Sequence, residues 1–387
     1  MASIIVSGAL ANKPFNGGEA WVRLSWVLGF RRLGFDVCFV EQIASVDCRD
    51  AVGAVTTFDA CVNREYFRLL TKQFGLSAPS CLIYQNGEQT EGLTFKEMMA
   101  RADDAALLVN ISGHLAIDPL LGRIRRKAYI DIDPGFTQFW HADPDSAFRV
   151  AKHDDYFTIG ENIGTPACSI PTSGIDWRPI RQPVVLEHWP VCLSERLDRF
   201  TTVASWRGPY GPIRYGGKTF GLKVHEFRKF IEMPARSSAA FEIALDIHSA
   251  DNKDRDLLLA QGWRLTDPRT AAGNPNAFRS YVQSSAAEFS VAQGVYVDTN
   301  CGWFSDRTVG YLASGKPALV QETGFSRNIP TGKGLFAFST MAEAAAGARD
   351  IAGNYSSHCQ AARSLAESLF DSDKILGRLL DDIKVAA

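Results

Sequence analysis

The feature that most constrains the fold is an alternation of short apolar runs with segments of helical periodicity. SIIVSG at 3–8, DVCFVEQI at 36–43 and AALLVNIS at 105–112 are such runs. Between the first two, apolar residues such as Trp21 and Leu24 recur at helical spacing. Continuously apolar strands that alternate with helices predict an α/β protein with a parallel, doubly wound sheet.

The alternation stops at a proline-rich segment and then resumes. PTSGIDWRPIRQPVVLEHWP, residues 171–190, holds four prolines, a density that interrupts helices and sheets and is typical of a linker. With 387 residues, the chain is long enough for two domains. We expect Rossmann-like domains at 1–170 and 196–365, joined by a linker at 171–195. Residues 366–387 are expected to form a C-terminal helix that returns toward the first domain.

Composition excludes several classes of protein. The chain is 46% hydrophobic and 22% charged, as in ordinary globular proteins, and a formal net charge of −2 provides no overall attraction to nucleic acid or anionic membranes. The eight cysteines are scattered without a CxxC pair, which favours reduced thiols in a cytoplasmic protein. No apolar run reaches the ~18 residues of a membrane span. A basic segment, RIRRK at 123–127, could touch lipid headgroups or form a solvated face.

The segment CGWFSDRTVGYLASGKPALVQETG, residues 301–324, has the composition of a helix start suited to an anion. Ser305 is expected at the N-cap, and Asp306 suits the positive end of the helix dipole. Free backbone N–H groups there, with the Arg307 guanidinium beside them, would suit a diphosphate. The alternative is that Ser305 and Asp306 only cap the helix and that Arg307 forms a surface ion pair.

Three stretches resemble motifs of GT-B glycosyltransferases, especially the large glycogen-synthase-like family. FNGGEAWVRLSWVLGFRRLGFDVCFVE at 15–41 resembles the family's glycine pair, helix and second strand. IPTSGIDWRP at 170–179 resembles its interdomain signature, and YLASGKPALV at 311–320 resembles its Ala-x-Gly-x-Pro-Val element. The resemblance implies two Rossmann-like domains facing a cleft, the first binding the acceptor and the second the nucleotide sugar.

The activity that this resemblance implies is transfer of a hexosyl or deoxysugar unit from a UDP- or dTDP-type donor. The acceptor would be a hydroxyl or amine of a small molecule or another polar compound. Fixed cations would neutralise the diphosphate, so we expect no metal and no cofactor besides the nucleotide-sugar co-substrate. The glycine pair is not a dinucleotide fingerprint, because GxGxxG is absent after the first strand, which counts against a dehydrogenase.

The resemblance also implies a set of donor-binding residues. Arg207 and Lys218 stand in glycine-rich loops after the second domain's first strand, where such families place an Arg and a Lys against the diphosphate; solvent exposure is the alternative. The other donor-binding candidates are Gly17, Gly18, Gly302, Trp303, Phe304, Ser305, Asp306, Arg307 and Glu322.

The chain departs from the family at two positions. Retaining members carry two glutamates separated by seven residues, and the corresponding positions here are Gly302 and Gly310, whose side chains cannot accept a hydrogen bond. The tripeptide at 305–307 could substitute for them, with Glu322 reaching the sugar or ribose. This departure leaves both a retaining and an inverting outcome open.

Catalytic and acceptor-binding candidates follow strands of the first half. His114, in VNISGHL, follows a predicted strand and could accept a hydroxyl proton or bond to the donor sugar, or have a purely structural role. Asp131 and Asp133, in YIDIDPGFTQFW, would point the same way from a strand. Asp133 is a second catalytic candidate, and Asp131 would join Phe136 and Trp140 in an acceptor wall; capping carboxylates and core aromatics are the alternatives.

Two other functions compete with transfer. A GT-B epimerase would act on the nucleotide sugar itself and would need a pair of acid and base residues. A non-catalytic partner of another transferase would only bind the sugar nucleotide, which the missing glutamates keep open. Transfer to nucleobases in DNA gains no support from the near-neutral charge.

Overall fold

The computed structural model describes residues 2–148, 150–208 and 210–385, which fall into two compact units. The first unit comprises Met1–Ile132, Val150–Phe157 and Ser372–Ala387, and the second comprises Asp133–Arg149 and Thr158–Asp371. Each is built on a largely parallel sheet with helices, so the predicted α/β class is confirmed. The expected domain limits at 170 and 195 stay a prediction.

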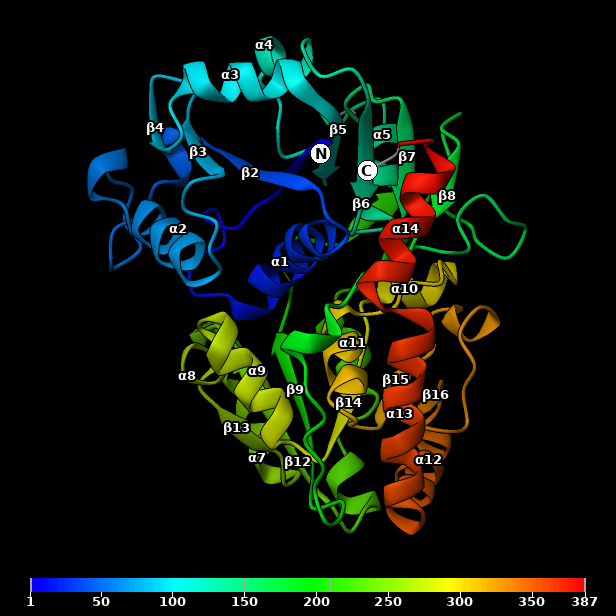
Figure 1. Ribbon diagram of the computed structural model, residues 1–387. Coiled ribbons are helices and arrows are strands. Elements are labelled where there is room, and N and C mark those ends of the chain that lie inside the picture. The colour runs from blue at the N-terminus through cyan, green and yellow to red at the C-terminus, as the bar shows by residue number, and fades with distance from the viewer. Residues whose placement is uncertain (1, 149, 209, 386–387) are drawn as a thin grey trace. The chain divides into compact units, whose positions relative to one another are not determined.

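The first sheet has the strand order β4-β3-β2-β1-β5-β6-β7-β8 (Figure 1). In this order, every pair of adjacent strands from β3 through β2, β1 and β5 to β6 is parallel, and β4 is antiparallel to β3. The chain leaves β1 toward β2 and later resumes on the other side with β5, a reversal of strand order beside which such sheets bind ligands. The strands are β1 Ser3–Ser7, β2 Asp36–Ile43, β3 Ser80–Tyr84, β4 Gln89–Gly92, β5 Ala105–Ile111, β6 Lys127–Asp131, β7 Asp155–Thr158 and β8 Trp177–Pro179.

Five α-helices accompany this sheet in the described part of the first unit: α1 Gly17–Arg32, α2 Val62–Gln73, α3 Phe95–Asp104, α4 Asp118–Leu121 and α14 Ser372–Asp382. Asn16 caps α1 by accepting a hydrogen bond from Glu19 N at 3.1 Å. The last helix packs on the first: a Cβ at Gly29 would lie 2.5 Å from Leu376 Cδ1. Glycine at this position therefore lets α14 approach α1 closely.

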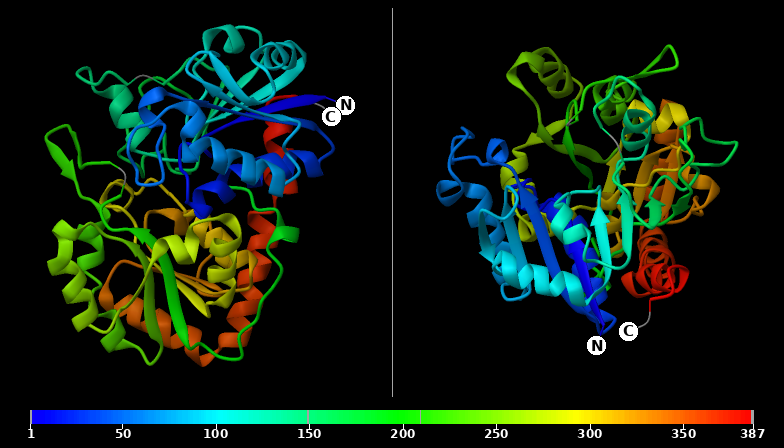
Figure 2. Two further views of the ribbon diagram at one scale, coloured as in Figure 1. Left: turned by 90° about the vertical axis from the view of Figure 1, so that its left-hand side faces the viewer. Right: turned by 90° about the horizontal axis from the view of Figure 1, so that it is seen from above.

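The second sheet has the order β13-β12-β9-β14-β15-β16 and is parallel throughout. Helices α9, α11 and α13 lie side by side over one face (Figure 1), and a hairpin, β10–β11, extends away from the strands (Figure 2, left). The strands are β9 Arg199–Ser205, β10 Ile213–Tyr215, β11 Lys218–Phe220, β12 Ala240–Asp246, β13 Arg264–Thr266, β14 Ala287–Ser290, β15 Ala318–Gln321 and β16 Leu335–Phe338.

The helices of the second unit are α5 Phe136–Ala142, α6 Lys223–Arg228, α7 Asn252–Ala260, α8 Pro268–Ala272, α9 Pro275–Ser284, α10 Gly294–Thr299, α11 Asp306–Ala313, α12 Met341–Gly353 and α13 Tyr355–Leu369. Its core is rich in aromatic rings: Phe200 stacks on Phe241 at 4.9 Å, and Phe289 on Phe338 at 5.1 Å between centroids. Short 3-10 turns occur at Ser45–Asp47, Phe58–Ala60, Leu186–His188, Met233–Arg236, Ser249–Asp251 and Phe325–Arg327.

The apolar run EFSVAQGVYV, residues 288–297, predicts a strand, but only its first part forms one. β14 ends at Ser290, and the β-branched GVYV that follows begins α10. Gly294 explains the change of structure, because a Cβ there would lie 2.7 Å from the Gly221 carbonyl oxygen. Close backbone packing at this point overrides the local preference of valine and tyrosine for strands.

The basic segment at 123–127 is largely ion-paired. Arg123 binds Asp103 at 2.6 Å and Arg126 binds Asp155 at 2.7 Å. Within the described ranges, no helix combines the length and the hydropathy needed to cross a membrane. The eight cysteines all carry free thiols.

Candidate active site

Arg307 connects the start of α11 to the carboxyl ends of two neighbouring strands. Its Nε donates to Glu288 Oε1 at 2.7 Å, its Nη1 to the Val203 carbonyl at 2.9 Å, and its Nη2 to Ser290 Oγ at 2.7 Å. Glu288 is fully buried, and the Arg307 side chain is 12% exposed. Most of the guanidinium's donors are thus engaged by the protein, so Arg307 fixes the first turn of α11. Its role as a diphosphate ligand stays a prediction.

Lys223, the first residue of α6, lies close enough to this ion pair to feel its charges. Burial, and then the Arg307 charge, lower the pKa of Lys223 to about 7, against the opposite effect of Asp306 and Glu288. No residue in the described part of the chain forms a hydrogen bond or ion pair with its ammonium. Lys223 is therefore a partly buried amine, about half protonated at pH 7, whose charged form an anionic ligand would stabilise. It is not among the donor-binding residues predicted from the sequence.

The two cations that the sequence analysis chose have other surroundings. Arg207 is 55% exposed and pairs with Asp251, Nε to Oδ2 at 2.7 Å. Lys218 is exposed in the hairpin β10–β11, with its ammonium 5.0 Å from the centroid of the Phe220 ring. Their role in binding a donor stays a prediction.

Packing explains both glycines at the positions of the family's glutamates. Gly302 has a φ of +80°, and a Cβ there would lie 3.0 Å from Asn162 Cγ. A Cβ at Gly310 would lie 3.0 Å from Trp189 Cη2, and Trp189 is itself buried. Glutamate side chains do not fit at either position without displacing these neighbours.

The other donor candidates around α11 are mostly held by the protein. Ser305 stands at the N-cap as expected, but its side chain makes no capping hydrogen bond. Trp303 stacks on Tyr296 with centroids 4.4 Å apart, and Phe304 is buried against neighbouring phenylalanines. Glu322 turns back on its own loop, where Oε1 accepts from Gly324 N at 2.6 Å. Asp306 is partly buried at the first position of the helix.

Two side-chain oxygens of the second unit, one of a carboxylate and one of an amide, are buried without a hydrogen-bond partner in the described structure. They are Glu288 Oε2 and Gln293 Oε1. The Gln293 side chain lies over Gly208, where a Cβ would be 3.2 Å from Nε2. Gln293 directly precedes Gly294, whose backbone contacts Gly221 two residues before Lys223. The Glu288 carboxylate is thus close enough to Lys223 to affect its pKa, and Gln293 stands beside a backbone contact with the segment that leads to Lys223.

In the first unit, His114 lies near three charged residues from the β1–α1 region. Burial first, and then the charges of Arg23 and Lys13, lower the pKa of His114 to about 4, while Glu19 opposes this shift. His114 is therefore neutral at physiological pH. Arg23 is buried and forms an ion pair with Glu19. None of the three was predicted from the sequence: Glu19 and Arg23 lie on α1, whose pattern does not reveal the burial of Arg23, and Lys13 lies in the loop before it.

The loop that carries Lys13 is fixed by a buried carboxylate. Glu41 on β2 accepts hydrogen bonds from Ala11 N at 2.6 Å and Asn12 N at 2.8 Å. Gly17 and Gly18 follow this loop, and they lie in the first turn of α1. Contact between their backbone and a donor stays a prediction.

The predicted acceptor residues belong to different units. Asp131 is a fully buried residue at the end of β6, in the first unit, whereas Asp133 precedes α5 in the second. Within the second unit, the rings of Phe136 and Trp140 pack on Tyr210 with centroids 5.0 and 4.8 Å apart. This packing is that of a partly exposed aromatic cluster, and contact with an acceptor stays a prediction.

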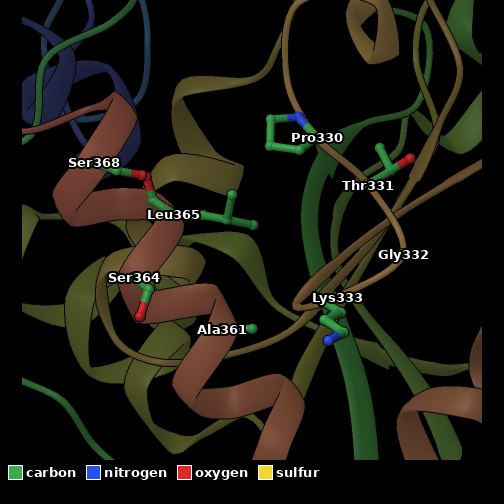
Figure 3. Close-up of a pocket in the computed structure, with 8 residues that line it drawn as sticks. All are labelled: Pro330, Thr331, Gly332, Lys333, Ala361, Ser364, Leu365 and Ser368. Carbon is green, nitrogen blue, oxygen red and sulfur yellow. The ribbon is translucent and has the colours of Figure 1, made fainter.

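A separate groove of about 620 Å³ lies elsewhere in the second unit (Figure 3). It runs between the loop at 330–333, ahead of β16, and the α13 residues Ala361, Ser364, Leu365 and Ser368. None of the predicted site residues lines it. In the described residues, no group of three or more His, Cys, Asp or Glu side chains is arranged to hold a metal ion.

Comparison with solved structures identifies the fold. The chain superposes with a TM-score of 0.59 and 10% identity on an α-glucosyltransferase in complex with UDP and a 13-mer DNA containing a central A:G mismatch, covering 99% of both chains. This is the GT-B fold. The fold also aligns with HepE from Anabaena in complex with UDP and glucose (TM-score 0.57, 12% identity, 100% of both chains). Sucrose-phosphate synthase from Thermosynechococcus elongatus gives 0.54 at 10% identity, again over 100% of both chains.

The predicted GT-B architecture is thus confirmed by the structure, although the sequences have diverged far. No family model matches the chain, and no curated protein sequence matches it.

Proposed function

We propose that the protein is a glycosyltransferase that moves a sugar from a nucleotide diphosphate sugar, of UDP or dTDP type, to a polar acceptor. The observation that carries this proposal is Lys223, a partly buried ammonium without a hydrogen-bond partner in the described residues. It lies near Asp306 and Arg307, where α11 begins. The GT-B neighbours that were solved with UDP support a nucleotide as the ligand.

Each group near α11 has a distinct role in this proposal. Lys223 supplies the positive charge for the diphosphate, and charge-assisted hydrogen bonds of this kind are stronger than neutral ones. The backbone N–H groups in the first turn of α11 supply further donors, aided by the helix dipole. Arg307 holds that turn in place through Glu288 and Ser290. Fixed cations stabilise the leaving diphosphate, so the proposed transfer is metal-independent.

His114 is the candidate base of the first unit. Because its pKa is about 4, its imidazole is neutral at pH 7 and can accept a hydrogen bond from an acceptor hydroxyl or amine. Such a group contributes to a proton transfer when it lies within hydrogen-bond reach of the proton. Asp133 is kept as the second candidate.

Incubation with UDP- and dTDP-sugars, with and without a set of polar acceptors, tests the proposal. Free nucleotide together with a glycosylated acceptor supports transfer. A new sugar that retains its nucleotide would indicate an epimerase instead. Binding without turnover would indicate a non-catalytic partner, a function that the glycines at 302 and 310 favour. Calorimetry with UDP and dTDP on the same sample separates loss of binding from loss of chemistry.

A further inference from the structure

The turn that carries His114 is held by one buried side chain, Asn110. Its Oδ1 accepts a hydrogen bond from Leu115 N at 3.0 Å, and its Nδ2 donates to the Leu115 carbonyl at 3.0 Å. Asn110 is fully buried on β5. Both backbone groups of the residue after His114 are therefore bound by a single carboxamide, whose orientation is fixed because backbone N–H and C=O groups have unambiguous roles.

The Asn110 amide nitrogen also lies within hydrogen-bond distance of another histidine, His153. Asn110 Nδ2 lies 3.1 Å from His153 Nε2, and His153 Nδ1 lies 2.8 Å from the Ala151 carbonyl. Since Nδ2 can only donate, Nε2 must be the bare nitrogen that accepts. Since the carbonyl can only accept, Nδ1 must carry the proton. These contacts define one neutral tautomer of His153.

His153 also contacts the Tyr129 ring, which in turn lies against Gly113 in the His114 turn. The Tyr129 ring packs on His153 with centroids 5.4 Å apart, and a Cβ at Gly113 would lie 2.8 Å from Tyr129 Cε2. Ser112 and Gly113 have φ values of 55° and 68°, so the turn has a left-handed backbone that its surroundings must maintain. Asn110 lies on β5, Tyr129 on β6 and His153 two residues before β7, and these three strands are neighbours in the first sheet (Figure 1).

We propose that His153 is a positioning residue, which holds the His114 turn through Asn110 and releases it when its own imidazole becomes protonated. An imidazolium has N–H groups on both nitrogens, so Nε2–H would face the amide protons of Asn110. The amide could relieve this contact only by turning over, which would break both of its hydrogen bonds to Leu115. This release of the turn does not depend on whether the protein is an enzyme. Its effect on sugar transfer rests on the proposed function.

The groups around His153 determine where it titrates. Burial lowers the pKa of His153 most, and the charge of Lys127 lowers it further. The hydrogen bond to the Ala151 carbonyl and the charge of Asp154 act in the opposite direction. Tyr156 Oη accepts from His153 N at 2.8 Å and carries no charge near neutral pH. The net shift is downward, so the turn is held at neutral pH and released on acidification.

Hydrogen exchange on the wild-type protein tests the coupling directly. The exchange rate of the Leu115 amide, corrected for its intrinsic pH dependence, should rise by about tenfold as the imidazole of His153 titrates, the effect expected when one buried hydrogen bond is lost. NMR of the ring protons gives the titration midpoint independently. The proposal is overturned, without any variant being made, if the midpoint of Leu115 exchange differs from the midpoint of the His153 titration, or if the exchange rate does not change.

Variants separate the coupling from general acid destabilisation. His153→Gln keeps an acceptor for Asn110 but cannot titrate, so its Leu115 amide should stay protected across the range in which the wild type loses protection. His188→Gln, at a half-buried histidine of the second unit, should behave like the wild type. Equal loss of Leu115 amide protection on acidification in His153→Gln and in the wild type would refute the mechanism.

Steady-state kinetics relates the turn to the proposed function. In a protein with transferase activity, His153→Gln should shift the acid limb of kcat to lower pH and leave KM for the donor unchanged. If the acid limb of kcat is the same in His153→Gln and the wild type, the turn does not affect catalysis. If no nucleotide sugar is turned over but the exchange midpoints agree, the proposed function fails while the coupling stands.

Discussion

Arg307 donates to Glu288 across 2.7 Å at a point where the carboxylate is entirely removed from solvent. A carboxylate in such a place requires its partner, because an unpaired buried charge is much less stable than a buried ion pair. Arg307→Ala should therefore destabilise the protein by about 3–5 kcal/mol, measured by chemical denaturation. Arg236→Ala, which breaks an ion pair with Glu232 in which both side chains are exposed, is the matched control and should unfold near the wild-type midpoint. Similar midpoints for both variants would mean that Arg307 does not have this structural role.

Lys223→Gln should weaken UDP binding by roughly 10- to 150-fold, the loss of one charge-assisted hydrogen bond worth about 1.5–3 kcal/mol. The control is Lys218→Gln, which removes an exposed lysine from the neighbouring hairpin and should change the affinity little. Titration calorimetry measures both variants. If Lys218→Gln loses affinity and Lys223→Gln does not, the sequence-based choice of lysine was right and the structural one is wrong.

The affinity for UDP should depend on pH through the same lysine. With a pKa of about 7 in the free protein, Lys223 is mostly neutral at higher pH, and a diphosphate that favours the ammonium requires a proton to be taken up on binding. Linkage then weakens binding by roughly tenfold per pH unit between about pH 7.5 and 9. Calorimetry in buffers of different ionisation enthalpy should show proton uptake close to one, which Lys223→Gln should abolish.

His114→Ala should lower turnover by roughly 10²- to 10⁴-fold, the usual contribution of a general base, while donor affinity stays nearly constant. A histidine that only binds the substrate would instead raise KM and preserve kcat. The variant's thermal unfolding must match the wild type, since His114 is partly buried. Wild-type turnover in a folded His114→Ala protein would remove the residue from the mechanism.

Gly310→Ala should destabilise the protein by about 1–3 kcal/mol, because the added methyl would lie 3.0 Å from the buried Trp189 ring. The control is Gly377→Ala in α14, where no atom within 4 Å would oppose a Cβ. There the better helix propensity of alanine should stabilise by up to about 1 kcal/mol. Equal stability of the two variants would show that α11 can shift away from Trp189.

The sequence predicted the strands better than the site. β1, β2 and β5 appear where apolar runs indicated them, because periodicity and β-branching act locally. The start of α11 was also predicted correctly, at Ser305 and Asp306. The end of β14 was not, since it depends on contact between Gly294 and the distant Gly221.

Lys223 shows why the site itself was harder to predict. It stands five residues after Lys218; Lys218 follows Gly217, and Lys223 follows Gly221 by two residues, so the local sequence does not distinguish them. The distinction comes from packing, which places Lys223 near Arg307 and Glu288, far along the chain. The charged residues around His114 were missed for the same reason, because tertiary packing buries Arg23 on α1 and brings Lys13, in the preceding loop, close to His114.

The docking of α14 on α1 has a consequence for biosynthesis. Arg32 pairs with Asp373 at 2.9 Å, and Gly29 faces Leu376, so the two helices that meet are separated by most of the chain. At about 5–20 residues per second, a ribosome takes roughly 20–70 s between making the two partners. During that interval the apolar surface of α1 around Gly29 has no α14 to cover it, and the nascent first unit is a natural client for a chaperone.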